Sequence, residues 1–237
     1  MDFPAAALCH SNKHGRPIDP TMLRKDRQRP AGREVLMLTL IHAPLSRSSR
    51  IIWLLEELGA EYEIRYVNIC RWDGSGGPDE NNPHPHKQVP ALLHDGTLVW
   101  ESAAVVQYLT DLYPDCSLGR PPGHPDRGAY LSWLAYYAGV IEPTALAHMS
   151  GVTVNNPALA RLYTEMCAHV IDVLTRHPYL IGEKMSAADL LLASALQWMR
   201  KILPESDVID RYIRVVTDRP ALQRAREIDS KPSGFHD

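Results

Sequence analysis

The amino-acid sequence, 237 residues long, predicts an α+β domain followed by an all-α helical bundle. Short apolar runs of β-prone residues are confined to the first half of the chain. Residues 115–125 are rich in proline and glycine, a composition that suits an inter-domain linker. Beyond this linker the apolar residues recur at helical spacing, so we expect no strand there.

A strand, a helix and a second strand are expected at the start of the folded region. Residues 36–42 (LMLTLIH) are apolar and β-prone, which indicates a buried strand. Residues 48–59 have helical apolar spacing and end in glycine, a natural helix stop. Residues 63–69 alternate apolar and polar side chains, which indicates another strand. Together they predict a right-handed βαβ unit with a parallel strand pair.

A long loop, a hairpin and a helix complete the first domain. Residues 70–88 form the loop, and residues 91–94 and 97–100 flank an Asp-Gly turn typical of a β-hairpin. Residues 102–112 read as a helix that the following Pro114 brings to an end. The order β-α-β-loop-β-β-α predicts a thioredoxin-like domain over residues 36–114.

The second domain, residues 126–230, is expected to be entirely helical. The predicted helices lie at residues 126–150, 157–176, 186–202 and 207–217, with a short one from residue 220. At the other end, residues 1–35 have no hydrophobic period and carry several prolines and basic residues. We therefore expect a disordered extension that is dispensable for folding and for ligand binding.

Composition and charge exclude several classes of protein. A net charge of -3 offers no field of one sign for nucleic acid or for an acidic membrane. No apolar run reaches bilayer length and no secretory signal is recognisable, so a cytoplasmic location is expected. The four cysteines are far apart and the histidines have no ligand spacing. We expect free thiols and no metal, with His84 and His86 as surface residues of a loop.

Three stretches of the chain together resemble the glutathione S-transferase family. They are SRSSRIIWLLEELGAEYE from Ser46, QVPALLHDGTLVWESAAVVQYLTDLYP from Gln88, and LIGEKMSAADLLLASALQWM from Leu180. The resemblance implies the glutathione transferase fold and glutathione as co-substrate. It also implies detoxifying attack of the thiolate on small, mostly apolar electrophiles. A homodimer is implied as well, with Val105 and Tyr108 near its interface.

The second stretch implies a glutathione site. In this family the proline after valine, here Pro90, is cis, and Val89 would then pair with the cysteinyl backbone of glutathione. Glu101 would hold the γ-glutamyl ammonium. Ser102 and the helix N-terminus would hold the γ-glutamyl carboxylate. A serine that merely caps a helix is the alternative for Ser102.

One position departs from the family pattern. Lys87 stands where the family has glycine, and Gln88 follows it. Either side chain could reach the glycyl carboxylate of glutathione, Gln88 as a neutral donor and Lys87 with its charge. The sequence leaves both open.

Three hydroxyls, those of Ser46, Ser48 and Ser49, stand at the turn where a thiolate needs a donor. A free thiol has a pKa of ~8.5, so the protein must stabilise the anion. In serine-type members the active serine lies four residues before a characteristic arginine, here Arg50, which selects Ser46. The run Ser-Arg-x-x-Arg in this turn also resembles a fungal and bacterial subgroup of the family in which a serine stands at this place. Helix capping is the alternative for Ser48 and Ser49.

Other features leave alternatives open. Ser186 and Asp189 form a predicted N-capping box. Tyr136 and Tyr137 are candidates for the second-substrate pocket, although aromatic residues at helical spacing more often belong to a core. The turn contains no cysteine or tyrosine, which argues against dithiol reductase and tyrosine-type mechanisms. A catalytically silent glutathione-binding or interaction module, or a glutathione-dependent peroxidase or disulfide reductase, remains an alternative function.

Overall fold

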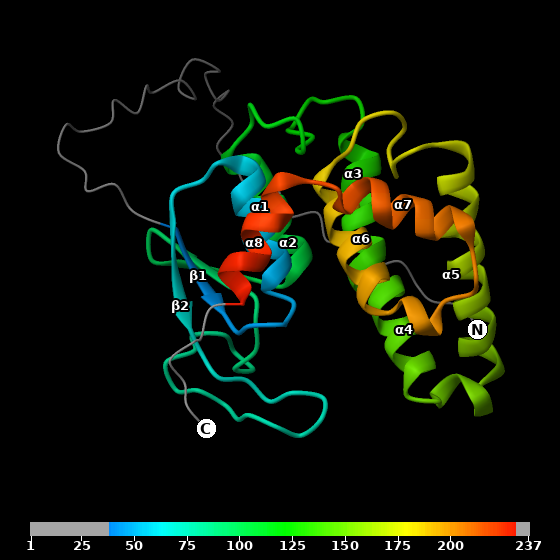
Figure 1. Ribbon diagram of the computed structural model, residues 1–237, viewed down its shortest axis with the longest axis horizontal. Coiled ribbons are helices and arrows are strands. Elements are labelled where there is room, and N and C mark those ends of the chain that lie inside the picture. The colour runs from blue at the N-terminus through cyan, green and yellow to red at the C-terminus, as the bar shows by residue number, and fades with distance from the viewer. Residues whose placement is uncertain (1–37, 231–237) are drawn as a thin grey trace, which may run out of the picture. The chain divides into compact units, whose positions relative to one another are not determined.

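The computed structural model describes residues 38–230, and the predicted extension at residues 1–35 lies outside that range (Figure 1). The first half contains β1 (Leu38–His42), α1 (Ser49–Leu58), β2 (Tyr62–Tyr66), β3 (Ala91–His94), β4 (Thr97–Trp100) and α2 (Ser102–Leu112). The strands form one sheet in the order β2-β1-β3-β4. Strand β1 is parallel to β2 and antiparallel to β3, which in turn is antiparallel to β4. The predicted thioredoxin-like topology is therefore confirmed.

Within the described residues the second half contains helices and connecting turns, with one isolated bridge between Tyr179 and Gly182 and no strand. Its α-helices are α3 (Arg127–Tyr136), α4 (Glu142–Met149), α5 (Pro157–Arg176), α6 (Ala187–Trp198), α7 (Asp207–Thr217) and α8 (Pro220–Asp229). Short 3₁₀ turns occupy Val152–Asn155 and Arg200–Ile202. The helix expected at residues 126–150 contains a π-helical turn, Tyr137–Ile141, between α3 and α4. Such turns occur frequently at functional sites.

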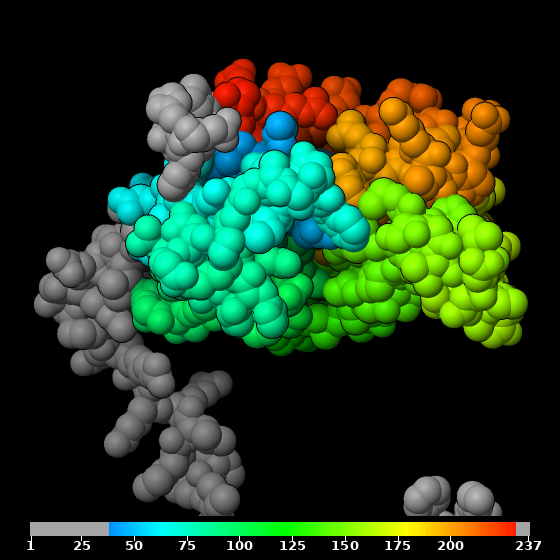
Figure 2. Space-filling model, turned by 90° about the horizontal axis from the view of Figure 1, so that it is seen from below, coloured from blue at the N-terminus to red at the C-terminus, as the bar shows by residue number. Residues whose placement is uncertain are grey.

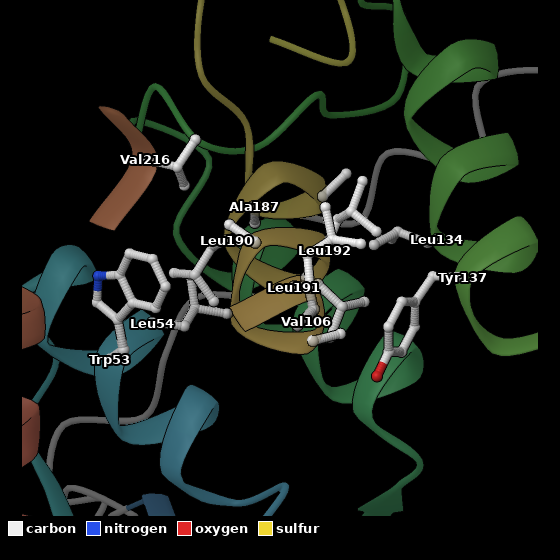
Figure 3. Close-up of a cluster of buried hydrophobic side chains, with 14 of the residues drawn as sticks. Trp53, Leu54, Val106, Leu134, Tyr137, Ala187, Leu190, Leu191, Leu192 and Val216 are labelled. Atoms are coloured by element: carbon white, nitrogen blue, oxygen red, sulfur yellow. The ribbon is translucent and has the colours of Figure 1, made fainter. Parts of the chain in front are cut away.

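A single hydrophobic core joins the two halves, with α6 at its centre. Leu190, Leu191 and Leu192 are all buried, because neighbouring elements cover the first turns of α6 on every side. Figure 3 shows side chains from α1 on one side of α6 and from α3 and the π-helical turn on the other. The two halves are therefore held together by apolar packing as well as by the linker.

The predicted capping box is present at the start of α6. The carboxylate of Asp189 accepts hydrogen bonds from the Ser186 amide at 2.8 Å and from the Ser186 hydroxyl at 2.9 Å. It also accepts from the amide of Leu180 at 2.8 Å and from the hydroxyl of Tyr212 at 3.0 Å. One fully buried carboxylate thus joins three segments of the helical half.

The last helix returns to the first half and packs along α1 (Figure 1). The guanidinium of Arg224 pairs with Glu56 at 2.7 Å, and Arg219 pairs with Glu57. This packing places Asp229, the last residue of α8, against the turn between β1 and α1. The sequence offers no sign of this contact, because Leu45 and Asp229 are separated by 184 residues.

Candidate functional site

Two adjoining cavities lie between the sheet-containing half and the helical half. The larger has a volume of about 690 Å³ and the smaller about 600 Å³. Figure 2 shows a hollow between the cyan loop after β2 and the yellow-green helices, with blue atoms of the β1–α1 region at its edge. The residues that line both cavities are Arg47, Cys70, Arg71, Trp72, Gln88, Val89 and Glu142.

The smaller cavity brings together most of the predicted glutathione contacts. Gln88, Val89, Pro90, Glu101 and Ser102 all line it. The Val89–Pro90 peptide bond is cis, as expected. Within residues 38–230 no hydrogen bond uses the backbone N–H or C=O of Val89, so both groups are available to an extended peptide ligand.

The start of α2 has an unusual backbone conformation. Glu101 has φ +70° and ψ +130°, an unusual backbone conformation for a residue with a side chain, and such strain is concentrated at functional sites. Glu101 occupies the capping position, so Ser102 is the first residue of the helix and does not cap it. Its hydroxyl makes no hydrogen bond within the described residues. The capping alternative for Ser102 therefore has no support in this geometry.

The structure separates the two candidates for the glycyl carboxylate. Lys87 has φ +53°, which explains the glycine expected there, because glycine adopts that conformation without strain. Its ammonium donates to the carbonyl of Asn82 at 3.0 Å, and the side chain lines neither cavity. Gln88 lines both cavities, and the Asn82 side chain holds its carbonyl at 3.0 Å.

The three candidate serines have three different surroundings. Ser46 lines the larger cavity, accepts a hydrogen bond from the Ser48 amide at 3.2 Å and donates to the carbonyl of Ala43 at 2.6 Å. Ser48 is fully buried and lines neither cavity. Ser49 lines the larger cavity but donates its hydroxyl proton to Asp229 at 2.8 Å. No side chain caps α1, so the capping alternative for Ser48 and Ser49 is not what the structure contains.

Tyr136 and Tyr137 point to different places. Tyr137 lies in the π-helical turn, lines the smaller cavity and accepts a hydrogen bond from Arg50. Burial raises the pKa of Tyr137 to about 12, although the nearby Arg50 guanidinium opposes the rise. Tyr136 packs against Trp133 and His169 and lines neither cavity. Tyr137 therefore lies at the smaller cavity, and Tyr136 belongs to the helix packing.

Several cavity residues escaped the sequence analysis. His84, expected at the surface, is buried, lines the smaller cavity and meets Trp100 edge-on with ring centroids 5.5 Å apart. Burial lowers the pKa of His84, although Glu101 nearby opposes the shift. Arg47 and Glu142 form an ion pair at 2.6 Å where the two cavities meet. Neither a motif nor a hydrophobic period marks these positions.

The described residues contain neither a cluster typical of a metal site nor a membrane-spanning helix. Within residues 38–230, no three histidine, cysteine or acidic side chains are grouped to hold a metal ion. No helix in that range is both long enough and apolar enough to cross a bilayer. The cysteines in this range, Cys70, Cys116 and Cys167, are free thiols.

Comparisons with known proteins agree with one another. Models described as the N-terminal and C-terminal domains of glutathione S-transferase match residues 46–112 and 152–224. Glutathione S-transferase 3 of Schizosaccharomyces pombe is 29% identical over 213 residues, 81% of this chain and 87% of the relative. A solved glutathione transferase from Methylococcus capsulatus is 28% identical, with a TM-score of 0.67 over 81% of this chain and 98% of that one. The solved glutathione S-transferase of Actinobacillus pleuropneumoniae is 27% identical, with a TM-score of 0.70 over 84% and 95%.

Proposed function

Because the chain belongs to the glutathione S-transferase family, we propose that it joins the thiolate of glutathione to small electrophiles held in the larger cavity. The observation that carries this proposal is that the predicted glutathione-binding groups and the predicted catalytic serine line adjoining cavities. The cis Val89–Pro90 bond and the Glu101–Ser102 helix start line one cavity, and Ser46 lines the cavity beside it. A binding module without activity would have no use for that serine.

The direct test of this function combines binding and turnover. We expect retention on immobilised glutathione and formation of a thioether from glutathione and a chlorodinitrobenzene, with release of chloride. In this reaction the thiolate forms a bond to the ring carbon and the carbon–chlorine bond breaks. Retention without any thioether, with a series of electrophiles, would favour the silent binding module. Turnover of hydroperoxides or glutathione mixed disulfides alone would favour the peroxidase or reductase alternative.

Glutathione is proposed to lie in the smaller cavity, with its γ-glutamyl group at the start of α2. Ser102 and the first amides of α2 hold the carboxylate, because a helix N-terminus attracts anions. Glu101 holds the ammonium, Val89 pairs with the cysteinyl backbone, and Gln88 donates to the glycyl carboxylate. The sulfur then points towards Ser46 in the neighbouring cavity.

Replacing Ser102 by alanine should weaken glutathione binding more than it weakens folding. A hydrogen bond to a charged group contributes about 1.5–3 kcal/mol, which corresponds to a roughly tenfold to 150-fold rise in Kd. The hydroxyl supports no other group within residues 38–230, so the melting temperature should change little. Titration calorimetry and thermal unfolding of the Ser102→Ala variant test this. An unchanged Kd would remove Ser102 from the glutathione site.

The proposed electrophile is a flat aromatic compound, because two exposed tryptophans line the larger cavity. Trp72 is 66% exposed and Trp198 is 54% exposed, so neither ring is packed in the hydrophobic core. Indole rings bind planar substrates by offset or edge-on stacking. Arg71 and Arg226 line the same cavity, and neither forms an ion pair within residues 38–230. These guanidiniums favour an anionic substituent on the ring.

A matched pair of substrates tests the anionic preference. We expect the Arg226→Gln variant to lose about 1.4- to fivefold in kcat/KM for a chloronitrobenzoate, since an exposed ion pair contributes about 0.2–1 kcal/mol. The uncharged amide of the same compound should react equally well with both enzymes. The loss should shrink at high salt because the charges are solvent-exposed. Equal losses for both substrates would show that Arg226 has no role in charge recognition.

We also propose that the chain has two domains, residues 36–114 and 126–230, joined by a linker at residues 115–125. We further propose that it has a detoxifying role in the cytoplasm and that two copies form a homodimer. Light scattering at micromolar concentration should give about twice the chain mass of 26.6 kDa. Val105, suggested by the sequence for the interface, is fully buried within the chain and so is excluded from it. Tyr108 is half-buried and bonds to His94 at 2.8 Å. A mass equal to one chain would rule the dimer out.

A further inference from the structure

A buried chain of polar groups leads from the larger cavity to the last helix. Ser46 lines the cavity, and its hydroxyl oxygen lies 2.8 Å from that of Ser48. The Ser48 oxygen lies 2.8 Å from Nδ1 of His42. Nε2 of His42 lies 3.2 Å from the carboxylate of Asp229. The four side chains therefore form one continuous series from the cavity to α8.

The imidazole in this series is shielded from water. His42 and Ser48 are both 0% exposed. The groups that face the His42 ring are Ser48, Asp229 of α8 and Tyr66 of β2, whose ring meets it edge-on at 5.5 Å. Nε2 of His42 has the distance of an ion pair to Asp229 without the geometry of a full hydrogen bond. A buried imidazole beside a single carboxylate can become an ion pair by taking up one proton.

The carboxylate of Asp229 stays charged despite its position. Burial alone would raise its pKa, but the adjacent His42 ring and the hydrogen bond from Ser49 outweigh burial and hold the pKa below the ordinary value. The amide of Leu45 also donates to it, at 3.2 Å. An ionised Asp229 favours the tautomer of His42 that carries its proton on Nε2. Nδ1 is then left as an acceptor for the hydroxyl of Ser48.

We propose that His42 receives the proton of the glutathione thiol through Ser46 and Ser48, and that Asp229 stabilises the resulting imidazolium. This inference rests on the proposed function. The S–H bond breaks as Ser46 accepts its proton. Ser46 turns its own proton from the carbonyl of Ala43 to Ser48 and passes it on, and Ser48 passes its own to Nδ1 of His42. The products are a thiolate, two intact hydroxyls and an imidazolium, so the charge is conserved. The proton returns along the same hydroxyls to water when the conjugate leaves.

This relay changes what is expected of Ser48. The sequence suggested a cap whose loss would matter little, but Ser48 is the link between the cavity and His42. His42 touches no substrate, so it is a positioning and proton-holding residue. Its contribution is therefore best measured by the proton balance of glutathione binding, that is, by the number of protons released to the buffer when glutathione binds.

Calorimetry in buffers of different ionisation enthalpy measures that balance. At about pH 7.5, a free thiol with a pKa of ~8.5 is mostly protonated and an ordinary imidazole with a pKa of ~6.5 is mostly neutral. We expect the unmodified protein to release almost no proton to the buffer on binding glutathione. His42→Asn keeps a polar group near Nδ1 but cannot hold the proton, so this variant should release about one proton for each thiolate formed. The number of protons released by Asp229→Asn should lie between those released by the unmodified protein and by His42→Asn.

Two further measurements keep the test decisive. The ¹⁵N resonances of His42, assigned by their loss in His42→Asn, should move to imidazolium values when glutathione is added to the unmodified protein. Asp210→Asn, a carboxylate on α7 that pairs with Arg200 and lines neither cavity, should leave the proton balance unchanged. If His42→Asn does not fold, the proton balance of Asp229→Asn, compared with that of Asp210→Asn, still tests the relay.

The outcomes separate the relay from the proposed function. Equal proton release by the unmodified protein and His42→Asn, with a neutral His42 in the complex, would overturn the relay while leaving glutathione binding intact. A complete absence of binding heat would instead contradict the proposed glutathione site. Proton retention that disappears in His42→Asn and decreases in Asp229→Asn would support the relay.

Discussion

The Ser46→Ala variant is expected to bind glutathione but to turn it over about tenfold more slowly, or worse. The Val89, Glu101 and Ser102 contacts remain, so the Kd should change little. The bound thiolate loses a hydrogen-bond donor, which raises its pKa. A rise of one pKa unit corresponds to about 1.4 kcal/mol and removes most of the thiolate at neutral pH. The measurements are thiolate absorbance against pH and turnover of a chloronitrobenzene.

The pH dependence of turnover by Ser46→Ala shows whether the loss comes from a raised thiol pKa. Because the pKa rises, the deficit of Ser46→Ala should shrink as the pH is increased and the thiol ionises without help. Ser49→Ala is the comparison variant, since its hydroxyl lines the same cavity but donates to Asp229, so its effect on the thiolate is indirect and should be smaller than that of Ser46→Ala. A collapse of Ser49→Ala with Ser46→Ala unaffected would show that the spacing from Arg50 selects the wrong serine. If neither variant matters, backbone amides or water activate the thiol.

The Asp189→Ala variant should lose about 3–5 kcal/mol of its free energy of unfolding, because a buried polar cluster loses its shared partner. Two amides and two hydroxyls donate to this carboxylate, and alanine leaves the amides of Leu180 and Ser186 and the Ser186 hydroxyl without it, while the Tyr212 hydroxyl keeps only the backbone carbonyl of residue 189 at 3.3 Å. The total stability of a domain is about 5–15 kcal/mol, so this loss is a large share of it and the denaturant midpoint should fall markedly. Denaturant unfolding followed by circular dichroism measures the loss.

Two variants distinguish the buried cluster from charge alone. Asp189→Asn keeps the shape and one acceptor oxygen, so it should be less destabilising than alanine but still damaging, because its amide faces donors. Asp210→Asn removes a carboxylate from a partly exposed ion pair with Arg200 and should have a much smaller effect. A similar small effect for Asp189→Ala would show that water readily replaces the carboxylate.

The sequence by itself determined the elements and their order. The periods of apolar residues predicted the strands and most of the helices, and 157–176, 207–217 and both hairpin strands coincide with the observed bounds. Local chemistry also determined the capping box of Ser186 and Asp189, since its residues are only three positions apart. The Val89–Pro90 and Glu101–Ser102 pairs were found because each is a contiguous motif.

Tertiary structure alone decided which polar groups share a cavity and which are buried. The contrast between Ser46 and Ser48, two residues apart, depends on how the turn packs on β1, which no periodic pattern encodes. Asp229 reaches this turn only because α8 folds back along α1, so its contacts with His42 and Ser49 span most of the folded chain. Apolar periodicity arises from neighbours on one element and is legible locally, whereas a site is assembled from distant side chains by the packing of those elements.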